Sequence, residues 1–331
     1  MNRQIIKCIS KPNTYMDKKE EHHNLPLFSI IIPMKNADRY IRNALYSIEK
    51  QNFNNIEVIV IDDNSDYTDV SKLLVDSWKN HHPNIHLKLL QTTKEQGGPG
   101  GARNIGLDNA KGKYILFLDA DDILNENALK SIKKAIDENP DTDIFVLGYQ
   151  LTRRDRYEND KKTYGLSAGK IQESRLFQIG ANTAGTIWNT CIRRELFGEK
   201  VDKYNIRFKP NCKFEDLPTK VNLFVRNKKK IKSISTITHT QYSRPNTSVT
   251  GTLLLADMKR LAEAHYEIAN IKAKEPNIGL SDKIYIDARK ISFIGVCSWL
   301  IQKAFRNNID RKRRQKEEEK KTLADEIMLG M

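Results

Sequence analysis

Cysteine is scarce in this chain, which has four cysteines among 331 residues. They lie far apart in the sequence and form no CxxC pair, at Cys8, Cys191, Cys212 and Cys297. This spacing is typical of neither a zinc site nor a disulfide framework. We therefore expect reduced thiols, as in a cytoplasmic protein.

Long hydrophobic runs are also missing. No run approaches the roughly 20 apolar residues that a membrane-spanning helix needs, so we expect none in this chain. The residues from Met1 to Leu25 are polar and charged, and they lack the apolar centre of a signal peptide. General disorder is excluded by a hydrophobic content of 39% with 11 Phe, 12 Tyr and 3 Trp.

Acidic residues are too few to balance the basic ones, because 42 Asp and Glu face 56 Lys and Arg, a net charge of +14. The excess gathers in Arg226–Lys232 and Lys303–Lys321. The second segment follows Ile291–Gln302, an uncharged run that suits a buried helix or one in a membrane interface. Basic runs are commonly solvated helix faces, and the sharper interpretation is peripheral contact with an anionic membrane. Stacking aromatics and groove-reading motifs are missing from both basic clusters, so we expect no nucleic-acid partner.

Apolar, β-branched runs alternate with helical patterns through the first half of the chain. Strands are predicted at Phe28–Pro33, Ile56–Ile61, Ile85–Leu90, Lys113–Leu118 and Asp143–Gly148. Helices are predicted between them, at Asp38–Gln51, Tyr67–Lys79, Arg103–Ala110 and Glu126–Glu138. This alternation is typical of βαβ units, so we expect an α/β fold with a Rossmann-like, mostly parallel central sheet flanked by helices.

The second half of the chain is less regular. Arg153–Lys162 is hydrophilic and is predicted to be a surface loop or hairpin. A helix and then a strand are predicted within Ser174–Gly198, a strand at Ile231–Thr238, and helices at Leu253–Lys274 and Ser281–Phe305. We therefore divide the chain into a polar N-terminal extension (1–26), an α/β domain (27–250) and a helical, basic C-terminal region (251–331).

Carboxylates follow two of the predicted strands. The pair Asp62-Asp63 follows the second strand, and the run Asp119-Ala120-Asp121-Asp122 follows the fourth. Asp commonly ends strands and caps helices, but two such clusters on strands that lie near each other favour a divalent metal site. Ligands that are all oxygen favour Mg²⁺ or Mn²⁺.

A glycine-rich segment, Gly97–Gly106, lies between the two acidic clusters. It is not a P-loop, because no Gly-Lys-Ser/Thr follows, and Arg103 occupies the third glycine position of a GxGxxG pattern. The glycines permit close approach of the backbone to a ligand, and Arg103 begins a predicted helix at which a phosphate could bind.

Seven segments together resemble the motifs of family 2 glycosyltransferases, in the same order and with similar spacing. In chain order they are Phe28–Asn36, Ile61–Ser65, Gly101–Gly106, Phe117–Asp122, Trp188-Asn189, Phe214–Asp216, and Tyr242–Arg244 with Ser248. The resemblance covers roughly residues 27 to 250. It implies a nucleotide-sugar-binding domain of the GT-A type, with the C-terminal helical region as an extension.

The resemblance also implies which residues bind the nucleotide-sugar. Pro33 and the loop after it contact the nucleotide, and Asp63 binds the uracil and ribose region. Arg103 lies near the base or the diphosphate, and Asp119 belongs to the metal motif beside the donor. Arg244 lies in a segment that closes over the diphosphate.

Catalytic and metal-binding roles are implied in the same way. Asp121 is the expected direct ligand of Mn²⁺ or Mg²⁺, with His239 as a further ligand, and Asp216 corresponds to the general base of inverting members. The chain departs from the family at Lys35, where an aromatic residue usually stands, and at Thr190, where a Lys commonly follows Trp-Asn.

We therefore expect a metal-dependent, inverting glycosyltransferase that moves a hexosyl group from a nucleotide-sugar, a UDP-sugar, to a hydroxyl of a glycan or lipid-linked acceptor. The setting implied is bacterial surface-glycan synthesis (lipopolysaccharide, capsule or oligosaccharide), in the cytoplasm and peripherally on the inner face of the plasma membrane. Two alternatives stay open on the residues alone. One is a nucleotidyltransferase, which also needs two carboxylates and a metal, and the other is a non-catalytic binder of nucleotides or nucleic acid.

Overall fold

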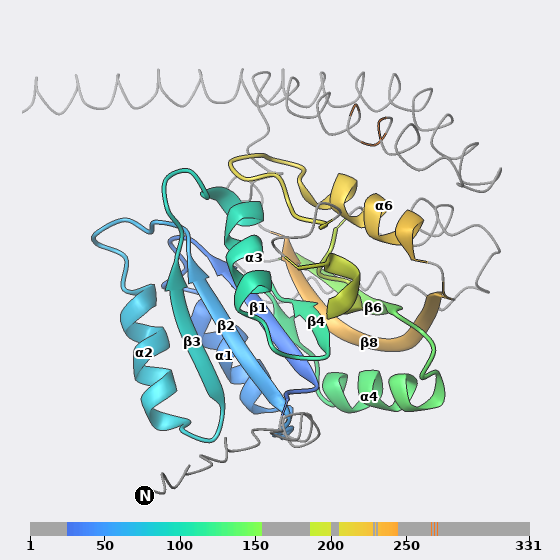
Figure 1. Cartoon of the computed structure of the whole chain (residues 1–331). Helices are drawn as coiled ribbons and strands as arrows, with labels where there is room; N and C mark the ends of the chain where they lie inside the picture. Colours follow the sequence, from blue (N-terminus) through green and yellow to red (C-terminus); the bar gives the residue numbers. More distant parts are fainter. Residues whose placement is uncertain are drawn as a thin grey trace, which may run out of the picture.

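The computed structural model describes residues 25–153, 186–199, 205–227, 229, 231–243, 266, 268 and 270. Within this part of the chain, eight strands form one sheet in the order β3-β2-β1-β4-β7-β6-β8-β5 (Figure 1). The strands are β1 (Phe28–Met34), β2 (Ile56–Asp62), β3 (His86–Gln91), β4 (Tyr114–Phe117), β5 (Ile123–Leu124), β6 (Ile144–Arg153), β7 (Thr190–Arg193) and β8 (Ile231–Ser243). The helices are α1 (Ile41–Glu49), α2 (Ser71–His81), α3 (Gly98–Asn109), α4 (Ala128–Glu138) and α6 (Asp216–Arg226), with a 3₁₀ turn at η2 (Arg194–Phe197).

The first half of the sheet is parallel. Strand β1 lies between β2 and β4, so that Ile30 is level with Val58 on one side and Leu116 on the other. Strand β7 then joins β4 to β6 by antiparallel pairing, and the short β5 pairs antiparallel with β8. Chain order therefore reverses beside β1, and ligands of open α/β sheets bind at the carboxyl ends of the strands near such a reversal.

Alternating side chains of the central strands form two hydrophobic cores, one on each face of the sheet. Ile30 and Ile32 pack on one face with helices α1, α2 and α4, whereas Ile31 packs on the other with α3 and α6. Figure 1 shows α3 in front of the sheet and α1 behind it. Because both faces are covered, β1 and β2 are almost continuously apolar rather than alternating with polar residues.

Helix α3 lies very close to the sheet because its middle contains a glycine. A Cβ atom on Gly106 would come within 2.4 Å of Ile31 Cγ2 and 3.1 Å of Ile61 Cδ1. A side chain here would push the helix away from β1 and β2. Gly106 therefore fixes the position of Arg103, which lies one turn earlier on the same helix.

The structure confirms the predicted strands of the first half and the fold class. Strands β6 and β8 extend beyond their predicted ends, to Arg153 and Ser243, and three further elements differ from the sequence analysis. Helix α3 begins at Gly98 rather than at Arg103, since Pro99 sets the backbone of its first turn. Strand β5 has two residues, too few for a periodicity to be visible. Helix α6 was not predicted as an element, although it has the buried face of an amphipathic helix.

Several predictions fall outside the described residues. These are the surface loop Arg153–Lys162 beyond its first residue, the helix within Ser174–Gly198, Ser281–Phe305, the uncharged run Ile291–Gln302 and the basic segment Lys303–Lys321. The extension 1–26, the predicted helix Leu253–Lys274 and the region 251–331 lie largely outside them. Among the helices that are described, none combines the length and the apolar character needed to cross a membrane.

Candidate active site

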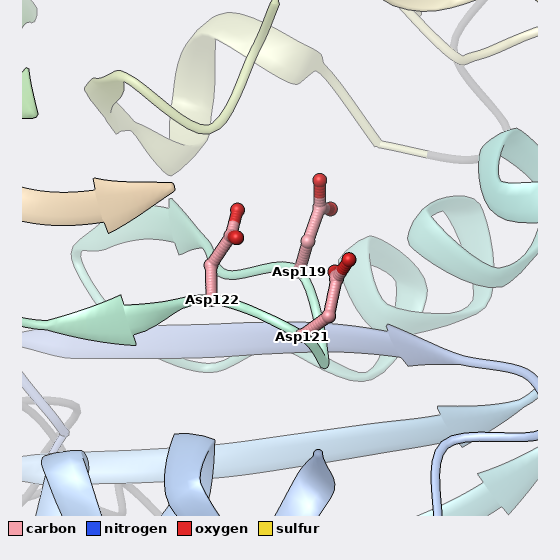
Figure 2. Close-up of side chains that lie close together, drawn as sticks. All are labelled: Asp119, Asp121 and Asp122. Carbon is pink, nitrogen blue, oxygen red and sulfur yellow. The ribbon is translucent and has the colours of Figure 1, made fainter. Parts of the chain in front are cut away.

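Three carboxylates come together directly after β4. Asp119, Asp121 and Asp122 each offer one oxygen atom, and these atoms lie within 4.8 Å of one another. Figure 2 shows the three side chains projecting to the same side of the turn that joins β4 to β5. Asp122 is buried and accepts a hydrogen bond from the Tyr242 amide at 2.9 Å, which ties the turn to β8.

This group fits a hard divalent cation. All the side-chain ligands it offers are carboxylate oxygens, which suit Mg²⁺ or Mn²⁺ better than softer metals. Two of the three carboxylates are partly exposed, so they face the solvent from which an ion and a phosphate would come. The residues of the predicted metal motif are thus side by side, and the assignment of Asp121 as the direct ligand stays a prediction.

Arg103 links this acidic group to the start of α6. Its Nη2 donates to Asp119 at 3.0 Å, while Nη1 donates to Glu215 at 2.6 Å and to Asp216 at 2.8 Å. Only 4% of the Arg103 side chain is exposed. Burial alone lowers the pKa of the guanidinium, but the three carboxylates outweigh burial and raise that pKa, so Arg103 is permanently charged.

The two carboxylates at the start of α6 hold protons more tightly than solvated carboxylates do. Burial raises the pKa of Glu215 to about 7, the charge of Asp216 adds to this, and Arg103 opposes it. Burial also raises the pKa of Asp216, against the stabilising charge of Arg103. A carboxylate with a raised pKa is a stronger base near neutral pH, which is the property that proton abstraction requires.

Asp63 occupies the carboxyl end of β2. Its Oδ1 accepts hydrogen bonds from the Gly98 amide at 2.9 Å and from the Thr92 hydroxyl at 3.0 Å, and Lys35 Nζ lies 3.7 Å from Oδ2. Gly98 has a φ of +78°, a left-handed conformation that glycine adopts without strain. The glycine-rich segment thus supplies the backbone donor that orients Asp63.

Pro33 lies beside Asp63. It is the penultimate residue of β1 and is level with Ile61 on β2, and the Asp63 amide donates to the Met34 carbonyl at 2.8 Å. The structure therefore brings Pro33, Asp63 and the first turn of α3 to one edge of the sheet. Arg103 bonds Asp119, another residue of the predicted nucleotide-sugar-binding group, and the binding roles of these residues stay predictions.

Of the two remaining predicted residues, only His239 lies in the part of the chain that the structure describes, and it is not in the acidic group. His239 lies on β8 opposite Leu124, is 1% exposed and bonds the Thr238 hydroxyl through Nδ1 at 2.8 Å. Burial lowers the pKa of His239 to about 4, so the imidazole is neutral at pH 7. It is not a member of the three-carboxylate group, and its role as a metal ligand stays a prediction. Arg244 lies outside the described residues.

Sequence reasoning assigned no role to Glu215 or Lys220, although both lie at this site. Glu215 is a partner of Arg103, and Lys220 is completely buried one helical turn after Asp216. Prediction of α6 as a helix would have given the signal, because residues four apart share a helix face.

Two curated relatives match parts of the chain. Minor teichoic acid biosynthesis protein GgaB of Bacillus subtilis (strain 168) is 30% identical over 206 residues, which are 61% of this chain and 21% of GgaB. Poly(ribitol-phosphate) beta-N-acetylglucosaminyltransferase TarS of Staphylococcus aureus (strain Mu50) is 40% identical over 122 residues, 36% of this chain and 20% of TarS. The chain therefore spans about a fifth of the length of these relatives.

Solved structures share the fold. S. aureus TarS 1-349 in complex with UDP has a TM-score of 0.56 and 23% identity, over 80% of this chain and 72% of that one. Mannosyltransferase PcManGT from Pyrobaculum calidifontis, in complex with GDP-Man and Mn²⁺, has a TM-score of 0.50 and 17% identity, over 86% and 88% of the two chains. This likeness confirms the expected GT-A arrangement of a central sheet flanked by helices.

The family comparison covers the region in which the motifs and the site lie. The family described as Glycosyl transferase family 2 matches residues 29–199, which include Asp63, Arg103 and the three carboxylates after β4. More than half of the chain falls within that match. The chain therefore belongs to glycosyl transferase family 2.

Proposed function

We propose that this glycosyltransferase moves a hexosyl group from a UDP-sugar to a hydroxyl group of a glycan or lipid-linked acceptor, with inversion at the anomeric carbon and with Mn²⁺ or Mg²⁺. The observation that carries the proposal is that one buried arginine bonds both a carboxylate of the proposed metal site and the proposed base. Arg103 joins Asp119, beside the metal-binding carboxylates, to Asp216, the predicted base. A nucleotide leaving group and an acceptor hydroxyl need these two kinds of group close together.

In this mechanism Asp216 takes the proton of the acceptor hydroxyl while the hydroxyl oxygen attacks the anomeric carbon and the bond to the diphosphate breaks. Arg103 orients Asp216 through the 2.8 Å bond to Oδ1. Asp121, with Asp119 and Asp122, would hold the divalent ion, which as a Lewis acid stabilises the charge of the leaving diphosphate. A single in-line displacement inverts the anomeric configuration.

The donor is proposed from the relatives. TarS has been solved in complex with UDP and with UDP-GlcNAc, and PcManGT with GDP-Man and Mn²⁺. These complexes support a nucleotide-sugar donor and a divalent ion, with UDP-sugars the first to test. Nucleotidyl transfer and non-catalytic binding are not favoured, because the chain belongs to a glycosyltransferase family.

The acceptor and the setting are proposed in the same way. GgaB and TarS are named for teichoic acid and poly(ribitol-phosphate) chemistry, which supports a bacterial surface glycopolymer as the acceptor. A cytoplasmic enzyme held at the inner face of the plasma membrane by its basic C-terminal region suits a lipid-linked acceptor. Binding of the full chain to anionic vesicles, with neutral vesicles as the control, tests this localisation.

A donor panel tests the reaction. The full chain is incubated with each of five donors: UDP-GlcNAc, UDP-GalNAc, UDP-glucose, UDP-galactose and GDP-mannose. Release of the nucleoside diphosphate is measured with and without Mn²⁺. We expect slow, Mn²⁺-dependent release from one UDP-sugar by transfer to water, because a bound donor is activated even without the acceptor. Release that is equal with and without Mn²⁺ contradicts the metal dependence, and no release from any donor contradicts the proposed function.

A further inference from the structure

Lys220 on α6 is a lysine that has no contact with solvent. Its relative exposure is 0%, which is rare for lysine unless the ammonium group has partners. Nζ donates to the Thr186 carbonyl at 2.7 Å and to Asn189 Oδ1 at 2.7 Å. Both partners belong to residues 186–189, the segment that leads into strand β7, and we call it the 186–189 segment.

The same segment contacts the predicted base. The Ile187 amide donates to Asp216 Oδ2 at 3.2 Å, while Arg103 holds Oδ1. Asp216 and Lys220 lie four residues apart in α6, on one face of the helix. The 186–189 segment therefore connects the two side chains, because Lys220 holds Thr186 and the next residue holds Asp216.

Lys220 also acts electrostatically on Asp216, because its charge when protonated lowers the pKa of that carboxylate. Burial lowers the pKa of Lys220 to about 7, and the charge of Asp216 opposes this. Asp216 also faces Arg103 from α3, Asp119 from the turn after β4 and the neighbouring Glu215. The 186–189 segment itself contributes no titratable side chain.

A purely structural role does not explain this arrangement well. Burying an ammonium group costs free energy, and an apolar side chain of similar volume commonly serves stability as well or better. A cation held beside a reactive carboxylate is instead typical of sites at which position and charge matter for chemistry.

We propose that Lys220 is a positioning residue for glycosyl transfer: it fixes the 186–189 segment, and the Ile187 amide then fixes the direction in which Asp216 meets the acceptor hydroxyl. The inference rests on the proposed function and on Asp216 as its base. Lys220 itself touches neither the donor nor the acceptor. Its loss therefore affects the rate of the chemical step and leaves donor binding intact.

Lys220→Met tests this inference in the full chain. The variant keeps the length of the side chain and removes the hydrogen bonds to Thr186 and Asn189, so the 186–189 segment no longer fixes the direction of Asp216. We expect UDP release from the donor found in the panel to slow at least tenfold, while the dissociation constant of UDP, measured by calorimetry with Mn²⁺, changes less than twofold. Asp63 and Asp121, the proposed nucleotide and metal residues, lie on other elements, which is why UDP binding should persist.

Asn189→Leu is a milder second variant in case Lys220→Met does not fold. It removes one acceptor of Lys220, Asn189 Oδ1, and the Nδ2 atom that is also lost has no hydrogen-bond partner among the described residues. We expect about a threefold loss of turnover, again with UDP affinity unchanged.

Lys88→Met is the matched control. Lys88 also bonds a buried carboxylate, Glu57 at 3.2 Å, and a main-chain carbonyl, that of Asn109 at 3.0 Å, but it lies away from Asp216. We expect lower stability and unchanged turnover per folded molecule. The inference is overturned if Lys220→Met retains normal turnover, or if turnover and UDP affinity fall together. A wild-type chain that releases UDP from no donor overturns the proposed function, and the inference with it.

Discussion

Two buried carboxylate sites in this domain differ in the direction of their pKa shifts. Glu57, near the amino end of β2, accepts hydrogen bonds from the Ser29 hydroxyl at 2.7 Å, the Gly112 amide at 3.1 Å and Lys88 at 3.2 Å. Burial alone raises the pKa of Glu57, but these donors and the Lys111 amide outweigh burial and hold the pKa below its usual range. Glu57 is thus a satisfied carboxylate, by which we mean that it is charged and that neighbouring donors meet its hydrogen-bonding needs.

Glu215 and Asp216 form a crowded site instead, in which three carboxylates compete for the charge of one arginine. Both share Arg103 with Asp119, and the pKa values of Glu215 and Asp216 are raised. Burial alone therefore does not set the basicity of these carboxylates, because the hydrogen-bond donors and charges around each one decide whether its pKa is lowered or raised.

The largest effect is expected at the crowded site. Asp216→Asn removes the proposed base and keeps the shape of the side chain, so UDP release should fall at least about 100-fold, the usual scale for loss of a general base. UDP affinity should stay within a few fold. Asp137→Asn, which removes an exposed ion pair with Lys133 on α4, is the control and should leave turnover unchanged. Near-normal turnover of Asp216→Asn would remove Asp216 from the mechanism.

A smaller effect, on stability alone, is expected at the satisfied site. Glu57→Gln replaces an anion that accepts several donors by a neutral amide, and Lys88 loses its partner. We expect the free energy of unfolding in urea to fall by about 2 kcal/mol, the order seen when a buried polar group loses its hydrogen-bond partner. Turnover per folded molecule should not change. If Glu57→Gln slowed turnover at equal folding, the two sites would not be independent.

The smallest effect is a difference in pH dependence. Burial raises the pKa of Glu215 from 4.5 to about 7, so between these values the folded protein holds a proton that the unfolded chain has released. Because the folded state binds more protons, its free energy of unfolding falls as pH rises through this range. Glu215→Gln cannot titrate, so the fall in its free energy of unfolding over this pH range should be smaller than that of the wild type by about 1 kcal/mol. The rest of the fall should remain, because Asp216 still titrates. Parallel pH profiles of wild type and variant would contradict the raised pKa.

Much of the fold could be predicted because its information is local. The apolar runs of β1 and β2 are long enough to identify strands, and the carboxylates after β2 and β4 follow directly in the sequence. Parallel strands place their carboxyl ends at one edge, so the acidic group after β4 could be expected there.

The contacts of Arg103 could not be predicted, because its partners are distant in the sequence. Glu215 and Asp216 lie 112 and 113 residues away, and periodicity carries no information over such distances. The resemblance implies a place for Arg103 near the base or diphosphate, and this stays a prediction, while the structure adds the bonds of Arg103 to three carboxylates. The burial of Lys220 was missed for a related reason, since its partners Thr186 and Asn189 belong to another element.

Helix α3 has a consequence for how the two halves of the site are spaced. Its first residue, Gly98, bonds Asp63, and Arg103, five residues later, bonds Asp216. Five residues of α-helix advance about 7.5 Å, and one inserted residue turns everything after it by about 100°. The geometry of one helix therefore sets the separation between Asp63, the proposed nucleotide residue, and Asp216, the proposed base. Surrounding loops can vary in length without altering it, whereas a single insertion between Gly98 and Arg103 cannot be absorbed.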